Sequence, residues 1–95
     1  MLILGNLKGK KLKEDRYPCV CCGFLTRFEP SNGDYDICSV CFWEDDPVQN
    51  DHPDMGGGAN SVSLNQARIN FKNYGASEQR FIKNVRPPYE SEYPI

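Results

Sequence analysis

The sequence has no long hydrophobic run, which excludes a membrane-spanning helix. Such a helix needs about 20 consecutive, mainly apolar residues, whereas the apolar stretch near the beginning covers only residues 1–4. This stretch is also too short for a signal-peptide core, and the lysines follow it instead of preceding it. We therefore expect no membrane association and a cytoplasmic location.

Lysine and arginine are missing from the middle of the chain. The formal net charge of the 95 residues is only −2, yet every formally charged side chain between residues 29 and 54 is a carboxylate. A nucleic-acid-binding domain usually presents a basic face, so this segment favours a basic protein partner over nucleic acid. A solvated acidic loop without a partner explains the same pattern. The carboxylates are Glu29, Asp34, Asp36, Glu44, Asp45, Asp46, Asp51 and Asp54.

Catalytic signatures are also missing. The sequence contains no nucleophile elbow, no Walker loop and no dinucleotide fingerprint. Its single histidine, His52, lies in a segment that Pro47 and Pro53 interrupt, so no helix pairs it with a second ligand. A catalytic metal needs three ligands in fixed geometry and an open position. We therefore favour a non-enzymatic protein, and a small metal-dependent hydrolase or redox protein is the alternative.

Cysteine is the residue type that the chain does have in an informative pattern. Cys19, Cys22, Cys38 and Cys41 read C-x2-C-x15-C-x2-C, which is zinc-ribbon spacing. Each C-x2-C knuckle turns two thiolates towards one point, and four thiolates make a closed, structural site. Thiols stay reduced in the cytoplasm, and five cysteines are an odd number for a disulfide set. We predict one zinc ion per chain, bound by these four residues.

Cys21 is the fifth cysteine, and it leaves one ambiguity. Because C-x-C pairs also bind zinc, Cys21 could replace Cys22 as a ligand in the first knuckle. It could instead be a redox-active thiol beside the metal. The simplest interpretation is a small residue packed under the knuckle.

These patterns predict an α+β fold, a small zinc ribbon followed by an αα-hairpin. In the ribbon the two knuckles are joined by a β-hairpin with strands at 24–28 and 35–38. Six side chains are expected to cover the sulfurs: Phe24, Phe28, Tyr35, Ile37, Phe42 and Trp43. Around a cysteine-rich domain at 17–88, the expected segments are an arm or edge strand at 1–16, the ribbon at 17–46, a loop at 47–62, helices at 63–86 and a loose tail at 89–95.

The clearest helix begins at Ser63. Ser63 and Gln66 fit a capping box, and Gly75 suits a left-handed helix stop. We expect Ser77 to cap a second short helix, which ends before the two prolines at 87–88. The first helix presents one apolar face, made of Leu64, Ala67, Phe71 and Tyr74.

Several separated motifs together resemble the bacterial cysteine-rich CPCC family. They lie at residues 17–23, 37–46, 57–60, 63–68 and 85–87, so the resemblance covers most of the chain. The family is named for Cys-Pro-Cys-Cys, and here Val20 stands where the proline would be. Since proline is not a ligand, this departure loosens the turn without removing metal binding. The resemblance implies no settled activity, and an immunity-type or accessory role follows only from the similar size of such proteins.

The partner surface is predicted to lie directly after the second knuckle. We expect a protein-binding surface made by the acidic loop and Trp43, with Asp45 and Asp46 on an exposed face that binds a basic partner, such as a nuclease-type toxin. The alternative is a nucleic-acid-binding ribbon that uses the N-terminal lysines Lys8, Lys10, Lys11 and Lys13.

Overall fold

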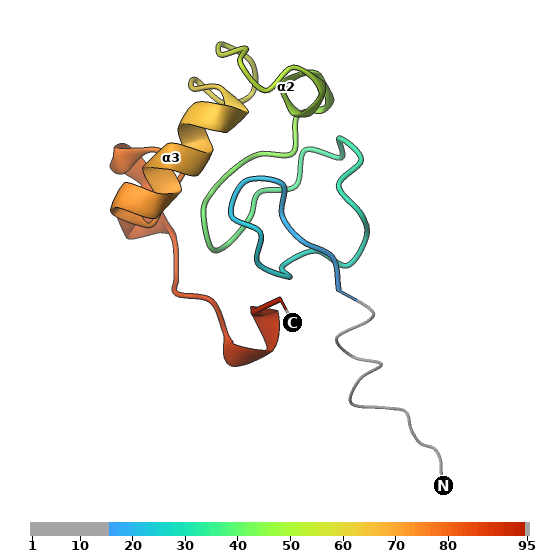
Figure 1. The fold of residues 1–95 in the computed structure, drawn as a ribbon, viewed down its shortest axis with the longest axis vertical. Helices are drawn as coiled ribbons and strands as arrows, with labels where there is room; N and C mark the ends of the chain where they lie inside the picture. Colours follow the sequence, from blue (N-terminus) through green and yellow to red (C-terminus); the bar gives the residue numbers. More distant parts are fainter. Residues whose placement is uncertain (1–15, 95) are drawn as a thin grey trace, which may run out of the picture.

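The computed structural model describes residues 16–94, and Figure 1 shows how its segments are arranged. Its regular elements are, in chain order, α2 (Pro47–Asp51), α3 (Leu64–Tyr74) and two 3₁₀ helices, η1 (Gln79–Asn84) and η2 (Glu90–Glu92). None of the helices in this described range is long and apolar enough to cross a membrane. The predicted N-terminal arm falls outside the range except for Arg16, and so do the N-terminal lysines.

Each cysteine knuckle closes on its own flanking residues. Isolated antiparallel bridges join Tyr17 to Arg27 around the first knuckle and Ile37 to Glu44 around the second. Within residues 16–94 there is no longer strand, and residues 24–28 make no backbone hydrogen bond with 35–38. The structure therefore shows a small domain with few helices and little strand, without the predicted hairpin between the knuckles. The intervening chain wraps around the carboxylate of Asp45 instead.

Helix α3 begins and ends where the sequence predicts. The hydroxyl of Ser63 accepts a hydrogen bond from the backbone N–H of Gln66 at 3.1 Å, and Gly75 ends the helix with a left-handed φ of 83°. The side-chain amide of Gln66 donates to Asn70, so only half of the expected capping box forms. Ser63 alone thus provides the cap that satisfies an unpaired donor of the first turn.

The second helix differs from the prediction. It is the 3₁₀ helix η1, preceded by Glu78 without a side-chain cap, so the expectation that Ser77 caps it is wrong. Ser77 is buried, and its backbone bonds to two other segments. Its N–H donates to the carbonyl of Cys41 at 2.7 Å, and its carbonyl accepts from the side-chain amide of Asn70. These contacts attach the chain after α3 to the second knuckle.

Residues 89–94 are not a loose tail. Glu92 is 1% exposed, and its carboxylate makes two 2.8 Å hydrogen bonds with the guanidinium of Arg86. Its carbonyl accepts from the N–H of Leu25 at 2.7 Å. The Tyr93 ring meets Phe24 edge-on, with 4.9 Å between ring centres. This C-terminal segment therefore packs against the first knuckle.

The core lies between the knuckles and α3. Leu64 and Ala67 of α3 are buried against the cysteines, together with Val40 and Trp43. Phe24 is half-buried beside Phe71 of α3. The prediction that six side chains cover the sulfurs is only partly right, because Phe28, Tyr35 and Ile37 are exposed. The cover comes from α3, which supplies apolar area from a distant part of the chain.

Candidate metal centre

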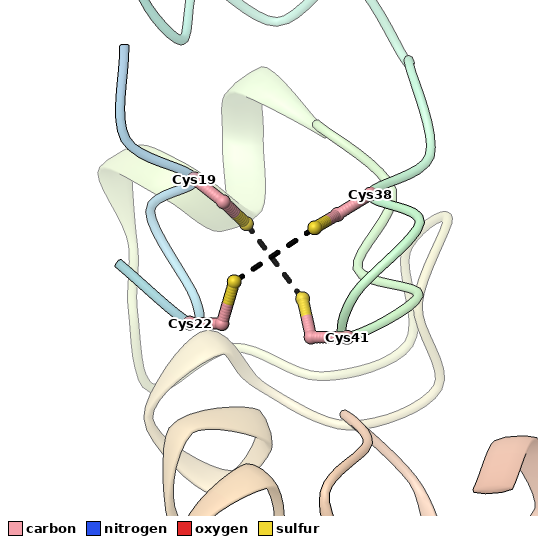
Figure 2. Close-up of side chains that lie close together, drawn as sticks. All are labelled: Cys19, Cys22, Cys38 and Cys41. Carbon is pink, nitrogen blue, oxygen red and sulfur yellow. Dashed lines mark hydrogen bonds between the residues drawn. The ribbon is translucent and has the colours of Figure 1, made fainter. Parts of the chain in front are cut away.

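Four cysteine sulfurs meet between the two knuckles (Figure 2). The first knuckle contributes Cys19 and Cys22, the second contributes Cys38 and Cys41, and all four Sγ atoms lie within 4.8 Å of one another. Cys22 is half-buried and the other three are buried. These four cysteines are therefore positioned to bind a metal ion, as their spacing predicts.

The sulfur separations fit a tetrahedral metal site. Across the two knuckles, Sγ of Cys19 lies 3.7 Å from Sγ of Cys41, and Sγ of Cys22 lies 3.8 Å from Sγ of Cys38. In a regular tetrahedron with metal–sulfur bonds of about 2.3 Å, the sulfurs are roughly 3.8 Å apart. The donor set thus has both the chemistry and the dimensions of a four-thiolate metal site. Disulfides are not present, since all five cysteines are free.

Backbone N–H groups point at the sulfurs. In each knuckle the first cysteine sulfur accepts a 3.4 Å hydrogen bond from the residue two positions later, Cys21 in one knuckle and Val40 in the other. Cys41 accepts a similar bond from the N–H of Trp43. Such donors orient metal ligands and stabilise negative charge on them.

The two knuckles close with the same backbone turn but different residues. The N–H of Gly23 donates to the carbonyl of Cys19, and the N–H of Phe42 donates to that of Cys38. Both turning residues have a left-handed φ, 81° for Gly23 and 72° for Phe42. A glycine adopts this conformation without strain, whereas a bulky side chain rarely does. The ring of Phe42 packs 4.5 Å from that of Phe81, a contact that helps to hold the strained turn.

Four thiolates this close together need a cation to balance their negative charge. Hydrogen bonding within the cluster, first of all with Cys19, lowers the pKa of Cys38 and raises the pKa of Cys41. The sulfurs alone therefore cannot all ionise, because each further thiolate would face the negative charge already present. A coordinated metal removes this conflict, since metal-bound thiols are deprotonated.

Cys21 is not part of the four-sulfur group. It is buried, and its N–H donates to Cys19 in the same way as the N–H of Val40 donates to Cys38. Cys21 thus takes the place in the first knuckle that an apolar valine takes in the second. The interpretation as a small packed residue agrees with this position.

The predicted partner surface is not exposed, so that expectation is wrong. Trp43 is 1% exposed and packs in the core, while Asp45 is 2% and Asp46 is 6% exposed. Carboxylates are buried only where donors satisfy them, and both aspartates have such donors. The sequence shows the acidic pair but not the backbone N–H groups that surround it.

Asp45 holds the chain between the knuckles. Its carboxylate accepts from the N–H groups of Gly33 at 2.8 Å and Asp34 at 3.1 Å, from Asn50 and from the hydroxyl of Ser31. Burial raises the pKa of this carboxyl, but the hydrogen bonds, led by that of Ser31, outweigh burial and lower the pKa to about 2.

Asp46 has a different structural role, as the N-cap of α2. It accepts hydrogen bonds from the N–H groups of Val48 and Gln49, and from that of Ala59 in the following loop. The bond from Ala59 lowers the pKa of Asp46. Asp followed by proline is a common way to begin a helix, so this role could have been read from the sequence.

Two further residues support the centre and were missed by sequence reasoning. The hydroxyl of Thr26 lies 3.4 Å from Sγ of Cys38. The guanidinium of Arg68, on α3, donates to the carbonyl of Val20 inside the first knuckle at 3.0 Å. Neither residue type signals a role at a metal site, since both contacts depend on how distant segments pack.

Comparison with known proteins agrees with the geometry. The family described as cysteine-rich CPCC matches residues 17–92, which includes both knuckles, α3 and most of the C-terminal segment. The chain belongs to this family. Among curated proteins no significant match was found. In this CPCC-family chain Val20 replaces the proline of the motif, and its carbonyl, which proline would also provide, accepts the bond from Arg68.

Proposed function

We propose that this chain is a small non-enzymatic protein in which one structural zinc ion organises a protein-binding domain. The observation that carries the proposal is the pair of sulfur separations, 3.7 and 3.8 Å, across the two knuckles. Tetrahedral four-thiolate sites select zinc or iron, and zinc suits a role without redox chemistry. When bound, the ion would link Cys19, Cys22, Cys38 and Cys41.

The composition of the site supports a structural role. Four thiolates leave no position open for water or substrate. Within residues 16–94, no second group of three or more His, Cys, Asp or Glu side chains comes together, and His52 is exposed. A structural ion also suits the size of the chain, because small domains bury too little apolar surface to be stable without a staple.

The charge distribution supports a basic protein partner in the cytoplasm. Reduced thiols are characteristic of that compartment, and the remaining carboxylates of the acidic segment include several exposed ones. Carboxylates on a surface steer a basic protein towards it and repel nucleic acid. An immunity-type or accessory role would use such a surface. The exposed carboxylates are Glu29, Asp34, Asp36, Asp51 and Asp54.

Metal content and thiol count together test the zinc site. The protein, purified under reducing conditions without added metal, should contain one zinc per chain by mass spectrometry. In the native, zinc-loaded protein at most one cysteine, Cys21, should react with a thiol reagent, and all five should react once denaturant and a chelator have released the zinc. Iron in place of zinc would contradict the structural-zinc proposal, and so would five reactive thiols in the native, metal-free protein.

A further inference from the structure

A shallow groove lies at the end of α2, away from the sulfur cluster. Its hollow has a volume of about 630 Å³, and α2 is labelled in Figure 1. All of its lining residues come from one short segment, 48–55: Val48, Asp51, His52, Pro53, Asp54 and Met55. The metal centre and its cover use none of these side chains.

The backbone of the groove is held by three hydrogen bonds, one of which comes from a buried side chain. The side-chain amide of Gln49, which is fully buried, donates to the carbonyl of Met55 at 3.0 Å. The N–H of Met55 in turn donates to the backbone carbonyl of His52. The carbonyl of Pro53 accepts from the backbone N–H of Asn65 in α3. A surface held by such contacts loses little conformational entropy when a partner binds.

The surface of the groove is apolar at its centre and acidic beside it. Val48 is 50% exposed and Met55 is 39% exposed, although both are large hydrophobic residues. The carboxylates of Asp51 and Asp54 lie beside them and are exposed. Residues 28–67 contain no Lys or Arg, so this stretch provides no cation of its own to neutralise them.

We propose that this groove binds a segment of another protein in which Lys or Arg stands beside an apolar side chain. The inference rests on the proposed protein-binding role and names its surface. The apolar side chain would cover Val48 and Met55, and the cation would pair with Asp51. Nucleic acid is disfavoured because its phosphates would lie against carboxylates. A second copy of the chain is disfavoured because a symmetric dimer would place the acidic groove of one copy against that of the other.

A peptide titration tests the proposal on the full chain loaded with zinc. The probe is the blocked peptide Lys-Leu-Lys-Leu-Lys, with Lys-Ser-Lys-Ser-Lys and Glu-Leu-Glu-Leu-Glu as controls. In ¹⁵N-resolved NMR spectra, the amide signals of Val48 and Met55 should shift with the first peptide, less with the second and not with the third. Shifts confined to other residues would show that the groove is not the binding site, and a protein-binding role would then use another surface. Equal shifts with all three peptides, or none, would overturn the inference.

Surface variants distinguish the groove from general attraction to an acidic protein. Met55→Ser and Asp51→Asn should each weaken binding of the Lys-Leu peptide about fivefold or more. The matched controls Ile69→Ser and Glu29→Gln remove an exposed apolar or acidic side chain elsewhere and should leave the affinity unchanged. Zinc content reports whether each variant is folded. An equal loss of peptide affinity in the groove variants and in their controls would overturn the inference. Shifts of the Val48 and Met55 amide signals caused by an RNA oligonucleotide, or by raising the protein concentration alone, would overturn it too.

Discussion

Two adjacent cysteines show how sharply position determines role in this molecule. Cys22 points its sulfur into the four-sulfur group, 3.8 Å from Cys38. Cys21 lies outside that group and occupies the position of Val40 in the other knuckle. Position 22 therefore requires a thiolate that can bind a metal, whereas position 21 requires only a small side chain.

Serine substitutions separate these two roles. Cys22→Ser should abolish stoichiometric zinc binding and leave the chain unfolded, because structural zinc contributes on the order of 10 kcal/mol. Cys21→Ser should retain one zinc and lose about 1–2 kcal/mol, the cost of burying a hydroxyl. Metal analysis and urea denaturation measure both effects. Zinc loss in Cys21→Ser equal to that in Cys22→Ser would show that the ligand assignment is wrong.

Asp45 is the residue on which the chain between the knuckles depends. Asp45→Asn should lower the free energy of unfolding by about 2 kcal/mol at pH 7, since hydrogen bonds to a charged group contribute about that much. Its folded pKa of about 2 lies below the ordinary 3.8, so the contribution is full above pH 4 and is lost only as the pH falls from about 4 to about 2.

The difference between wild type and Asp45→Asn should therefore stay constant from pH 5 to pH 8 in denaturation experiments. A decline within that range would contradict the assigned pKa. Asp36→Asn is the matched control, because Asp36 is exposed and its removal should change stability by less than about 0.5 kcal/mol.

At the scale of elements, the C-terminal segment acts as a clasp on the first knuckle. Glu92 joins Arg86 on one side and, through its carbonyl, Leu25 on the other. The hydrogen bonds with Arg86 lower the pKa of Glu92, so its negative charge persists in the folded protein at neutral pH. The clasp is thus a buried carboxylate paired with a half-buried guanidinium, and Arg16 and the N–H of Tyr89 also contact this carboxylate.

Glu92→Gln should destabilise the protein by about 1.5–3 kcal/mol, because the charge-assisted hydrogen bonds between Glu92 and Arg86 contribute about that much. Hydrogen exchange at the Leu25 amide should also become faster, since the clasp opens more often. Glu90→Gln is the control in the same turn, where the side chain is exposed. Slow, unchanged exchange at Leu25 in Glu92→Gln would show that the clasp does not depend on this ion pair.

Elements with a local cause were predictable, and those with a distant cause were not. Helix α3 depends on Ser63 and Gly75 at its two ends, and the metal site depends on cysteines a few residues apart in each knuckle. The burial of Asp45 and Glu92 depends on donors from other segments. In a sequence such carboxylates look the same as solvated ones, which is why the exposure of Asp45 and Asp46 and the loose tail were predicted wrongly.

For the whole molecule, folding and metal binding should be one process. A strong chelator is expected to remove the ion and abolish the near-ultraviolet circular dichroism of Trp43, which the core buries, and added zinc should restore it. Because protons compete with the metal for the thiolates, less chelator should be needed at pH 6 than at pH 8. A chelated protein that keeps its near-ultraviolet spectrum would show that the metal is not required for the fold.

The bond between Leu25 and Glu92 also sets an order of events during translation. Ribosomes add about 5–20 residues per second, so roughly 3–13 s separate the synthesis of these two residues. All four sulfur ligands are present once the ribosome has added Cys41, long before the residues of the clasp are synthesised. Metal capture is therefore available to the growing chain, and closure of the C-terminal clasp is a later step that only the longer chain can take.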